Sequence, residues 1–213
     1  MNIGIIGASG KAGSAIAKEA ASRGHQVTAI VRNAGKVADT GYAVLEKDIF
    51  NLSAQDLGAF DVVVNAFAAA PGQEHQHWEA GRALIAALQG ASNTRLIVVG
   101  GAGSLFADEA KTVRVVDTPD FPDFVKPIAL NQAKNLEDLQ NSSGIRWTFV
   151  SPSAFFNPEG KRTGAYRTGQ DVLLVNSKGE SYVSYADYAI AIVDEIEHPQ
   201  HENERFTVVS EAE

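Results

Sequence analysis

A glycine-rich segment near the amino terminus carries the clearest signal for chemistry in the sequence. Gly7, Gly10 and Gly13 follow the apolar run at residues 2–6 and precede a stretch of helical composition, with the spacing G-x-x-G-x-x-G. Glycines at this spacing permit a tight turn, a close approach of the backbone to a pyrophosphate, and close packing of helix on strand. The free amides and the positive dipole end of the helix would then face phosphate groups. The pattern predicts a dinucleotide-binding loop.

Two cationic residues lie near this loop. Arg32 ends the second apolar run, where a site that prefers NAD usually carries an acidic residue for the ribose hydroxyls. A guanidinium there suits a 2′-phosphate, and Lys11 lies inside the loop itself. We therefore expect NADP(H) to be favoured over NAD(H); the alternative is that Arg32 only pairs with a surface carboxylate. Asp48 is expected either to meet the adenine or to cap a turn.

The elements that must position these residues alternate along the chain. Short β-branched apolar runs are each followed by an alanine-rich stretch of helical length, which is typical of a parallel sheet covered on both faces. The sequence thus predicts a Rossmann-type, doubly wound α/β fold. The expected strands are residues 2–6, 26–31, 42–45, 61–65, 95–99, 146–150 and 205–209, and the expected helices are residues 11–23, 73–89, 131–140 and 184–197.

The length predicts one domain over residues 1–213. Within it, prolines and glycines break residues 151–183 into segments too short for another strand–helix unit, so we expect this part to form a small C-terminal substrate cap. Arg162, inside the cap, is expected to contact an acidic substrate or a flavin phosphate, or else to be a surface charge.

The composition excludes several classes of protein. The chain has no cysteine, which rules out disulfide frameworks, thiolate zinc sites and cysteine nucleophiles. A net charge of −8 argues against binding to nucleic acid or anionic lipid, because both require a basic face. No apolar run is long enough to span a membrane and no secretory signal is visible, so we expect a cytoplasmic protein. His75 and His77 would face different sides of a helix, so no metal site is expected.

A pocket for the second reactant is expected at the carboxyl ends of the strands, where open α/β sheets bind ligands. Phe155 and Phe156 follow the sixth strand and would wall a nicotinamide or stack on an acceptor, although one of two adjacent phenylalanines ordinarily belongs to the core. Residues 101–127 form a long connection that carries Phe121 and Phe124. Such a connection is either an aromatic lid over the acceptor or a flexible insertion.

Several segments together resemble a known family. They are GASGKAG at 7–13, VRN at 31–33, KDIFN at 47–51, VVGGAGSL at 98–105, WTFVSPSAFFNP at 147–158, GKRTGAYR at 160–167 and SYVSYADYAIAIVDEIE at 181–197. With them the chain resembles an atypical short-chain dehydrogenase/reductase of the NAD(P)H-binding, NmrA-like group, most closely the NADH-flavin reductases assigned by similarity within it. The group also resembles biliverdin reductase B. The resemblance implies a Rossmann domain, bound NAD(P)H and hydride transfer.

One departure from the family pattern bears on the chemistry. Short-chain dehydrogenases couple a serine to a Tyr-x-x-x-Lys motif whose tyrosine moves the substrate proton. Lys134 fits the lysine position, but the residue four before it is Leu130, which cannot transfer a proton. Ser104 fits the serine position or caps a loop. Alcohol and ketone chemistry are therefore not expected.

The remaining expectation is NADPH-dependent hydride transfer to a flavin, a quinone or a similar conjugated acceptor, because such acceptors take their proton from water. The alternative is a non-catalytic NAD(P)-binding sensor of the NmrA type. We expect a small-molecule acceptor as partner and a monomer or homodimer. The predicted cofactor residues are Gly7, Ser9, Gly10, Lys11, Ala12, Gly13, Arg32, Asp48, Ile49, Asn65, Ala66, Phe67, Gly100, Gly101, Lys134, Ser151, Pro152 and Phe155. The predicted catalytic residues are Ser104 and Lys134, and the predicted substrate residues are Phe121, Phe124, Phe155, Phe156 and Arg162.

Overall fold

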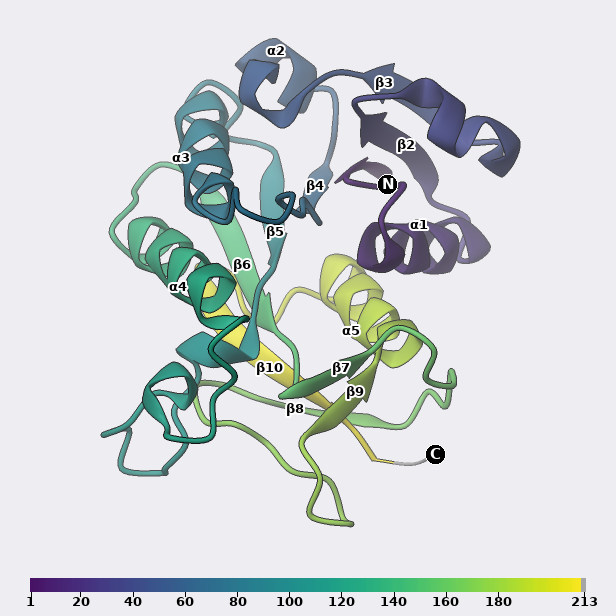
Figure 1. The fold of residues 1–213 in the computed structure, drawn as a ribbon. Helices are drawn as coiled ribbons and strands as arrows, with labels where there is room; N and C mark the ends of the chain where they lie inside the picture. The colour runs from purple at the N-terminus through teal and green to yellow at the C-terminus, as the bar shows by residue number, and fades with distance from the viewer. Residues whose placement is uncertain (212–213) are drawn as a thin grey trace.

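The structure is a computed structural model that describes residues 1–211, and it is built around one eight-stranded sheet (Figure 1). The strands of this sheet are β1 (Asn2–Ile6), β2 (Gln26–Val31), β3 (Ala43–Glu46), β4 (Val62–Asn65), β5 (Arg95–Val99), β6 (Arg146–Ser151), β8 (Tyr166–Gly169) and β10 (Glu204–Ser210). Their order is β3-β2-β1-β4-β5-β6-β10-β8, and all neighbours are parallel except β10 and β8. The predicted Rossmann-type α/β fold is confirmed.

Helices cover both faces of the sheet, as strands that are apolar on both sides require. On one face lie α1 (Lys11–Ser22) and α5 (Tyr185–Glu197), and on the other lie α3 (Gln76–Leu88) and α4 (Lys126–Gln140) (Figure 1). Each layer has its own core: Ile16 and Ile192 belong to the first, and Leu84 and Leu139 to the second. Ligands therefore have access to the ends of the strands rather than to the faces of the sheet.

The strand order creates a crevice at β1. This strand pairs with β2 on one side and with β4 on the other, so the connections that leave β1 and β4 diverge. In open α/β sheets such a switch point opens a ligand crevice at the carboxyl ends of the strands. Gly7 directly follows β1 and Ala66 directly follows β4. Both loops therefore end at the crevice.

Most of the expected elements are confirmed within one or two residues, and the differences have physical reasons. α4 begins at Lys126 rather than at residue 131, because Pro127 fits the first helical turn, where its missing amide needs no partner. α3 begins at Gln76 rather than at residue 73, after a series of turns. The short α2 (Ala54–Leu57) and the 3-10 turns η1 (Ala34–Thr40), η2 (Ile49–Asn51), η3 (Ala102–Ser104) and η4 (Val115–Asp117) are too brief to leave a periodic pattern.

The segment at 151–183 is divided between two sheets. β7 (Phe155–Asn157) pairs in parallel with β9 (Tyr182–Ser184) in a separate two-stranded sheet, whereas β8 forms the antiparallel edge of the main sheet. The Asp187 carboxylate of α5 accepts hydrogen bonds from the backbone amides of Thr163 and Gly164, at 2.8 Å and 2.9 Å, and ties the intervening loop to the helix. This part of the chain is thus anchored to the Rossmann core.

Candidate functional site

The glycine loop has the tight geometry that its sequence predicts. Gly7 has a φ of +75°, and a Cβ atom there would lie 2.5 Å from the carbonyl oxygen of Ala66. A Cβ at Gly13 would lie 2.3 Å from the carbonyl oxygen of Gly7, so helix and strand approach too closely for a side chain. Between them, Gly10 donates its amide to the Gly7 carbonyl at 2.8 Å. Glycine is therefore required at Gly7 and Gly13 by the fold itself.

The start of α1 is well suited to an anionic ligand. Gly10 is its N-cap and offers no side chain to accept the first amides of the helix, and the first turn contains no acidic residue. In most helices a capping side chain or an acidic residue partly satisfies these groups. At this helix the first amides and the positive dipole end can therefore bind a phosphate, the group that such helix ends commonly bind. The residues present fit the diphosphate of a dinucleotide.

A hollow of about 130 Å³ opens beside this loop. Its lining comes from the ends of β1, β2, β3 and β4, four strands that meet at the crevice. The residues are Ile6, Gly7, Ser9, Gly10, Ile30, Val31, Arg32, Lys47, Ile49, Ala66, Phe67 and Ala68. The structure thus brings together the glycine loop, the cation expected at the end of β2, and the residues that follow β3 and β4.

The side chains of the two cations predicted for this site have no partner among the described residues 1–211. Neither the Arg32 guanidinium nor the Lys11 ammonium forms a hydrogen bond or ion pair with any residue at 1–211, and both side chains are exposed. The alternative role for Arg32, pairing with a surface carboxylate, is therefore absent from the part of the chain that the structure describes. A third cation, Lys47, also lines the hollow, and its Nζ lies 2.6 Å from a carboxylate oxygen of Asp56. Lys47 was not predicted from the sequence as a site residue, because in the KDIFN segment only Asp48 matched an expected contact with the nucleotide.

The side chains of two polar residues near the site accept hydrogen bonds from backbone amides close to them in the chain. The Asp48 carboxylate accepts the amide of Phe50 at 3.0 Å and caps η2, which is the second of its two predicted roles. Asn65 is buried at the end of β4, and its side-chain oxygen accepts the amide of Phe67 at 3.1 Å. Asn65 thereby shapes the chain as it leaves β4 for the pocket.

The two residues predicted to be catalytic have structural partners. Ser104 is buried, and its hydroxyl accepts a hydrogen bond from Nη1 of Arg205 at 3.2 Å. The Lys134 ammonium lies 5.1 Å from the centroid of the Trp78 ring on α3. Leu130, one turn earlier on α4, is exposed and offers no proton. The residue four before Lys134 is therefore a leucine, with no group that could pair with the ammonium as a tyrosine would.

The loops after β5 and β6 leave little free space. Gly100 donates its amide to the Val150 carbonyl at 2.8 Å, and a Cβ on it would lie 2.1 Å from the ring of Phe149. A Cβ on Gly101 would lie 2.1 Å from the side-chain oxygen of Gln132, a contact that no sequence pattern indicated. Ser151 is fully buried, and its hydroxyl has no hydrogen-bond partner among the described residues. Pro152 beside it is also buried.

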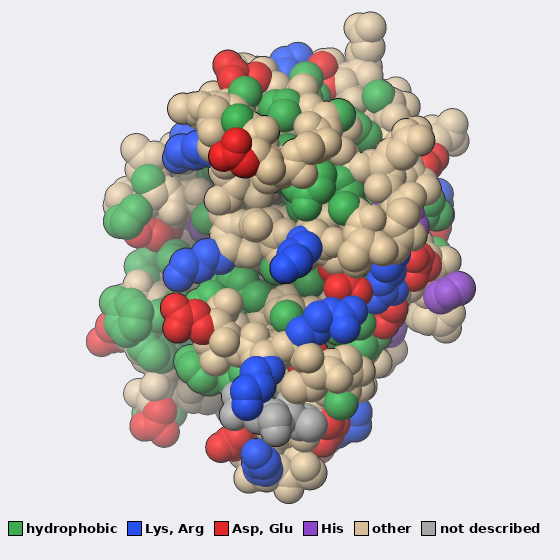
Figure 2. Space-filling model, turned by 90° about the vertical axis from the view of Figure 1, so that its right-hand side faces the viewer, with side chains coloured by type: hydrophobic (Ala, Val, Ile, Leu, Met, Phe, Trp, Pro, Cys, Tyr) green, Lys and Arg blue, Asp and Glu red, His purple; other side chains and the backbone are tan. Residues whose placement is uncertain are grey.

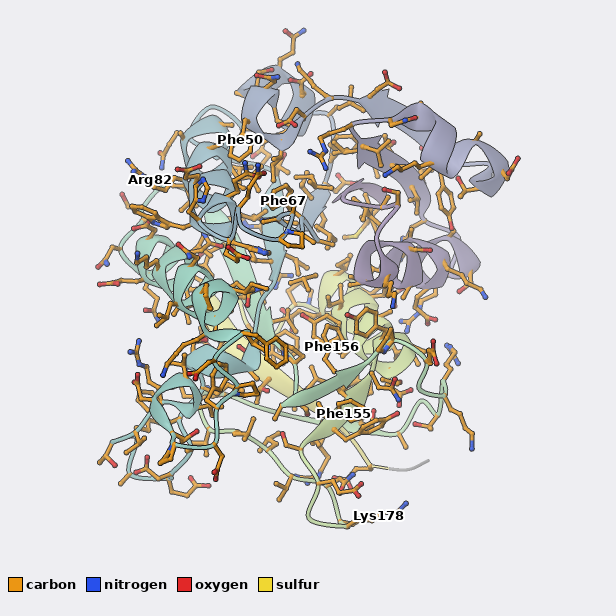
Figure 3. All side chains as sticks on the ribbon, viewed as in Figure 1. Phe50, Phe67, Arg82, Phe155, Phe156 and Lys178 are labelled. Carbon is orange, nitrogen blue, oxygen red and sulfur yellow. The ribbon has the colours of Figure 1, made fainter. Side chains whose placement is uncertain are left out.

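The adjacent phenylalanines of β7 point in opposite directions (Figure 3). Phe156 packs against Tyr185 and Tyr188, with ring centroids 3.9 Å and 4.7 Å away. Phe155 is 60% exposed and lies 5.6 Å from the ring of Tyr182 on the other side of the strand. The structure therefore does not place both rings on one wall, because successive side chains of a strand alternate. Tyr185 is the further aromatic residue at this place, and burial raises the pKa of its hydroxyl.

The remaining predicted substrate residues are dispersed. Phe121 is partly buried and lies near Gly103 of η3, whereas Phe124 is 85% exposed. The connection that carries them folds into η3 and η4 against the start of α4. Arg162 forms hydrogen bonds with both carboxylate oxygens of Glu19 on α1. The exposed Arg162 thus pairs with a largely buried carboxylate, and its contact with an acidic substrate or a flavin phosphate stays a prediction.

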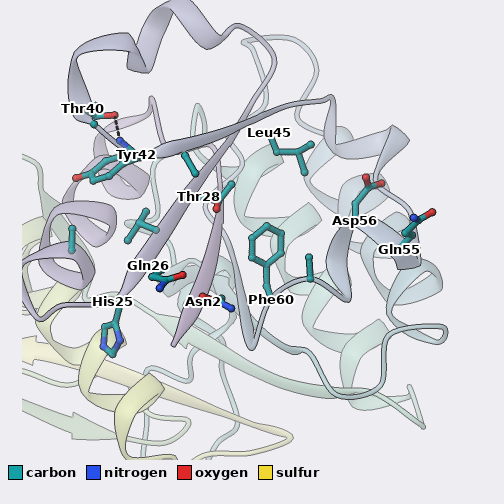
Figure 4. Close-up of a pocket in the computed structure, with 15 residues that line it drawn as sticks. Asn2, His25, Gln26, Thr28, Thr40, Tyr42, Leu45, Gln55, Asp56 and Phe60 are labelled. Atoms are coloured by element: carbon teal, nitrogen blue, oxygen red, sulfur yellow. Dashed lines mark hydrogen bonds between the residues drawn. The ribbon is translucent and has the colours of Figure 1, made fainter.

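A larger hollow, of about 1090 Å³, lies at the opposite end of the sheet (Figure 4). Amides and hydroxyls of Asn2, Gln26 and Thr28, at the amino ends of β1 and β2, line it together with the ring of Phe60. It has neither a glycine loop nor an unpaired cation, and the Thr40 hydroxyl within it accepts the amide of Tyr42 at 3.4 Å. The groups that suit phosphate therefore line the smaller hollow and not the larger one.

Other kinds of site find no support in the structure. No group of three or more histidine, cysteine, aspartate or glutamate side chains gathers as a metal site among residues 1–211. Over the same residues, no helix is both long and apolar enough to cross a membrane.

Comparison with known proteins agrees with the geometry. The chain is 67% identical, over the full length of both proteins, to the uncharacterized protein YwnB of Bacillus subtilis (strain 168). A crystal structure of a protein from Streptococcus pneumoniae TIGR4, named as a candidate NADH-flavin reductase, is similar with a TM-score of 0.92 and 43% identity over 99% of this chain and 100% of the other. An anaerobilin reductase from Escherichia coli O157:H7 shares the fold, with a TM-score of 0.76, 18% identity, and coverage of 99% of this chain and 97% of the other.

The family comparison covers all of the site except Ile6 at the end of β1. The family described as NAD(P)H-binding matches residues 7–199, a range that begins at the first glycine of the loop and extends past α5. Apart from β1, this range includes every strand and helix whose residues line the hollow. The chain belongs to this NAD(P)H-binding family.

Proposed function

We propose that the protein is an NADPH-dependent reductase of a flavin, a quinone or a similar conjugated acceptor. The observation that carries the proposal is Arg32, an exposed guanidinium beside the glycine loop that no carboxylate of the described chain neutralises. The similar protein from Streptococcus pneumoniae, named as a candidate NADH-flavin reductase, supports a redox role. Since that name specifies NADH, the preference for NADPH rests on Arg32 and its surroundings.

Each part of the site has a proposed task in binding. The amides at the start of α1 would hold the diphosphate, and Gly7 and Gly10 would let the backbone approach it. Arg32 would bind the 2′-phosphate through two N–H donors, with Lys11 adding positive charge, whereas Lys47 is paired with Asp56. Ile49 and Phe67 would border the adenosine end. These contacts orient the dinucleotide without providing a reactive group.

The choice of acceptor follows from the missing proton donor. When bound, NADPH supplies a hydride, which together with one proton from water reduces the acceptor by two electrons. With leucine at position 130 and the Lys134 ammonium near the Trp78 ring, we expect no tyrosine–lysine relay, so an acceptor whose reduction needs a positioned acid is disfavoured. A flavin or quinone needs mainly to be held close to the nicotinamide. We propose that the face between the loop after β4 and Phe156 holds this ring.

Steady-state oxidation of NADPH and NADH tests the proposal. The purified protein is mixed with each nucleotide and with FMN, riboflavin or a soluble quinone, and the nicotinamide absorbance is followed over time. We expect turnover with at least one acceptor and a lower KM for NADPH than for NADH. Nucleotide binding without turnover on any acceptor would contradict the reductase and favour the non-catalytic sensor. Tighter binding of NADH than of NADPH would contradict the role of Arg32.

A further inference from the structure

We propose that His77 is a positioning residue for nucleotide binding, because its neutral ring holds the loop that walls the pocket after β4. The wall consists of Ala66, Phe67 and Ala68, which line the hollow beside the glycine loop. His77 lies on α3 and is not one of the lining residues, but it contacts the loop at Phe67 and Ala69. The inference rests on the nucleotide site proposed above and assigns no step of hydride transfer to His77.

Two contacts connect His77 to the wall. The backbone amide of Ala69 donates a hydrogen bond to Nε2 of His77, with 3.3 Å between the two nitrogens. The ring of His77 also meets the ring of Phe67 edge-on, with 5.8 Å between centroids and 67° between planes. On its other side Phe67 meets Phe50 of η2 at 6.2 Å (Figure 3). Phe67 is thus held between a fixed turn and a helix.

The loop has few other attachments. Before the wall, Asn65 accepts the amide of Phe67, and after it Glu74 accepts the amide of Gly72 at 2.8 Å. Within the described chain, the bond from Ala69 to His77 is the one hydrogen bond that joins residues 68–71 to a side chain of α3. Without that acceptor the Ala69 amide would lose its partner, and a partly buried donor without a partner is unfavourable. The loop would then be free to rearrange over the pocket.

The hydrogen bond sets the protonation state that His77 must have. Because Nε2 accepts from Ala69, it carries no proton, and the neutral ring keeps its proton on Nδ1. Burial lowers the pKa of His77, since the charged ring is poorly hydrated there, while the nearby Glu74 carboxylate opposes this effect more weakly. The ring is therefore neutral at pH 7 and becomes protonated only at a pH below the ordinary histidine value of about 6.5.

Charged groups on the neighbouring elements are engaged elsewhere. On η2, the Asp48 carboxylate accepts the amide of Phe50. On α4, Lys134 and Asp138 both contact Trp78, the residue after His77. At the start of α3, His75 is the N-cap residue, and its ring lies 3.8 Å from the carboxylate of Glu79. Glu74 is thus the charged group that acts on the His77 ring, and protonation of that ring would break its bond to Ala69. Nucleotide affinity should fall as the pH falls through the pKa of His77.

Calorimetric titration with NAD⁺ tests the inference. NAD⁺ is chosen because it is stable in acid and lacks the 2′-phosphate, a group that itself titrates near pH 6. For the wild type we expect the affinity to weaken about threefold to tenfold from pH 8 to about pH 5.5, the size of one hydrogen bond. His77→Gln offers an amide oxygen that does not titrate, so it should bind nearly as well as the wild type at pH 8 and lose the pH dependence. His77→Phe keeps the ring contact but not the acceptor and should bind more weakly at every pH.

His75→Gln is the matched control, because His75 lies two residues before His77 and its ring contacts Glu79 rather than the loop. Its affinity and pH profile should equal those of the wild type, and thermal melts of all three variants show whether the fold is retained. A flat profile for the wild type, or an unchanged slope in His77→Gln, would overturn the role of His77 while leaving the nucleotide site intact. If the wild type bound no nucleotide at any pH, the proposed function would fail, and the role of His77 with it.

Discussion

The glycine-loop end of the molecule and its C-terminal third differ in whether their arginine side chains are paired with carboxylates. Beside the glycine loop, Arg32 and Lys11 have no partner among residues 1–211. After residue 140, by contrast, every arginine pairs with a carboxylate: Arg146 with Glu202, Arg162 with Glu19, Arg167 with Glu211, and Arg205 with Asp171. Figure 2 shows lysine and arginine side chains next to acidic ones across the face that carries α1 and α5. Paired charges connect elements, whereas unpaired charges remain available to a ligand.

The buried pairs show what the C-terminal third gains from this arrangement. Arg95 of β5 is 2% exposed, and it donates hydrogen bonds to Glu195 of α5 and to the Thr148 hydroxyl. Glu195 also accepts the backbone amide of His201 at 3.0 Å, so one carboxylate joins a strand, a helix and the turn before β10. The comparison therefore predicts that mutations in this third change stability, and that mutations at the glycine-loop end change binding.

The largest expected effect comes from breaking the buried pair. Glu195→Leu leaves the Arg95 guanidinium buried without a counter-charge, and we expect a loss of about 3 to 5 kcal/mol in the free energy of unfolding. Urea denaturation followed by circular dichroism measures it. The double variant with Arg95→Met should recover most of the loss, while NADPH affinity below the transition stays at the wild-type level. A loss below about 1 kcal/mol would show that the two side chains are not coupled in this way.

The next effect tests the opposite end of the comparison. Arg32→Gln removes an unpaired cation, so stability should stay within about 0.5 kcal/mol of the wild type. NADPH affinity should fall about tenfold to a hundredfold, the weight of a charge-assisted contact to phosphate, and NADH affinity should not change. Fluorescence titration with both nucleotides measures the ratio. Equal losses for NADPH and NADH would place Arg32 away from the 2′-phosphate.

How far the sequence predicts the molecule depends on the range of the interactions involved. The strands and the glycine loop were predictable because apolar runs and glycine spacing are local patterns, and Gly7 and Gly13 occur where the backbone leaves no room for a Cβ atom. The start of α4 was placed too late, since Pro127 was assigned to the preceding connection. The addition of β8 to the main sheet depends on pairing with β10, about 40 residues later, which a local pattern does not reveal.

The candidate site likewise contains residues that a local pattern predicts and residues that depend on long-range packing. The glycines and Arg32 lie within one strand–helix–strand unit, so their proximity follows from the motif. Lys47, Gln132 and His77 come from other elements, and their contacts depend on how α2, α3 and α4 pack. The direction of the Phe155 side chain depends on the register of β7 with β9, so its place relative to the cofactor pocket does not follow from the local sequence. The partners of Ser104 and Lys134, Arg205 and Trp78, likewise come from distant parts of the chain.

A smaller effect concerns Lys47, the one pocket cation that is paired. The Lys47 ammonium and the Ser53 hydroxyl lower the pKa of Asp56 to about 2. Because the folded-state pKa lies below the ordinary value, this carboxylate stabilises the fold above about pH 4, and the contribution disappears as the pH falls towards 2. Asp56→Asn should therefore lower stability at pH 7 and leave it unchanged near pH 2, as measured by urea denaturation at each pH.

The same substitution sharpens the contrast between paired and unpaired cations. Asp56→Asn releases Lys47 into the pocket, so we expect NADPH to bind about twofold to fivefold more tightly while NADH affinity is unchanged. Lys47→Gln is the complementary variant, and it should weaken NADPH binding slightly or not at all while Asp56 is present. An NADPH affinity in Asp56→Asn equal to that of the wild type would mean that Lys47 does not reach the 2′-phosphate.

The smallest effect is expected at Arg162, a paired cation that the sequence suggested as a contact for substrate. Its partner Glu19 keeps a second cation, Arg23, whose side chain lies 2.9 Å away, so Arg162→Gln should change stability by less than about 1 kcal/mol. If the pair is permanent, the KM values for FMN and for riboflavin, which lacks the phosphate, should both equal those of the wild type. A rise in KM for FMN alone would show that Arg162 exchanges Glu19 for the phosphate of the acceptor. In that case a paired cation of the C-terminal third would also bind ligand, and pairing in the free protein would no longer separate structural charges from functional ones.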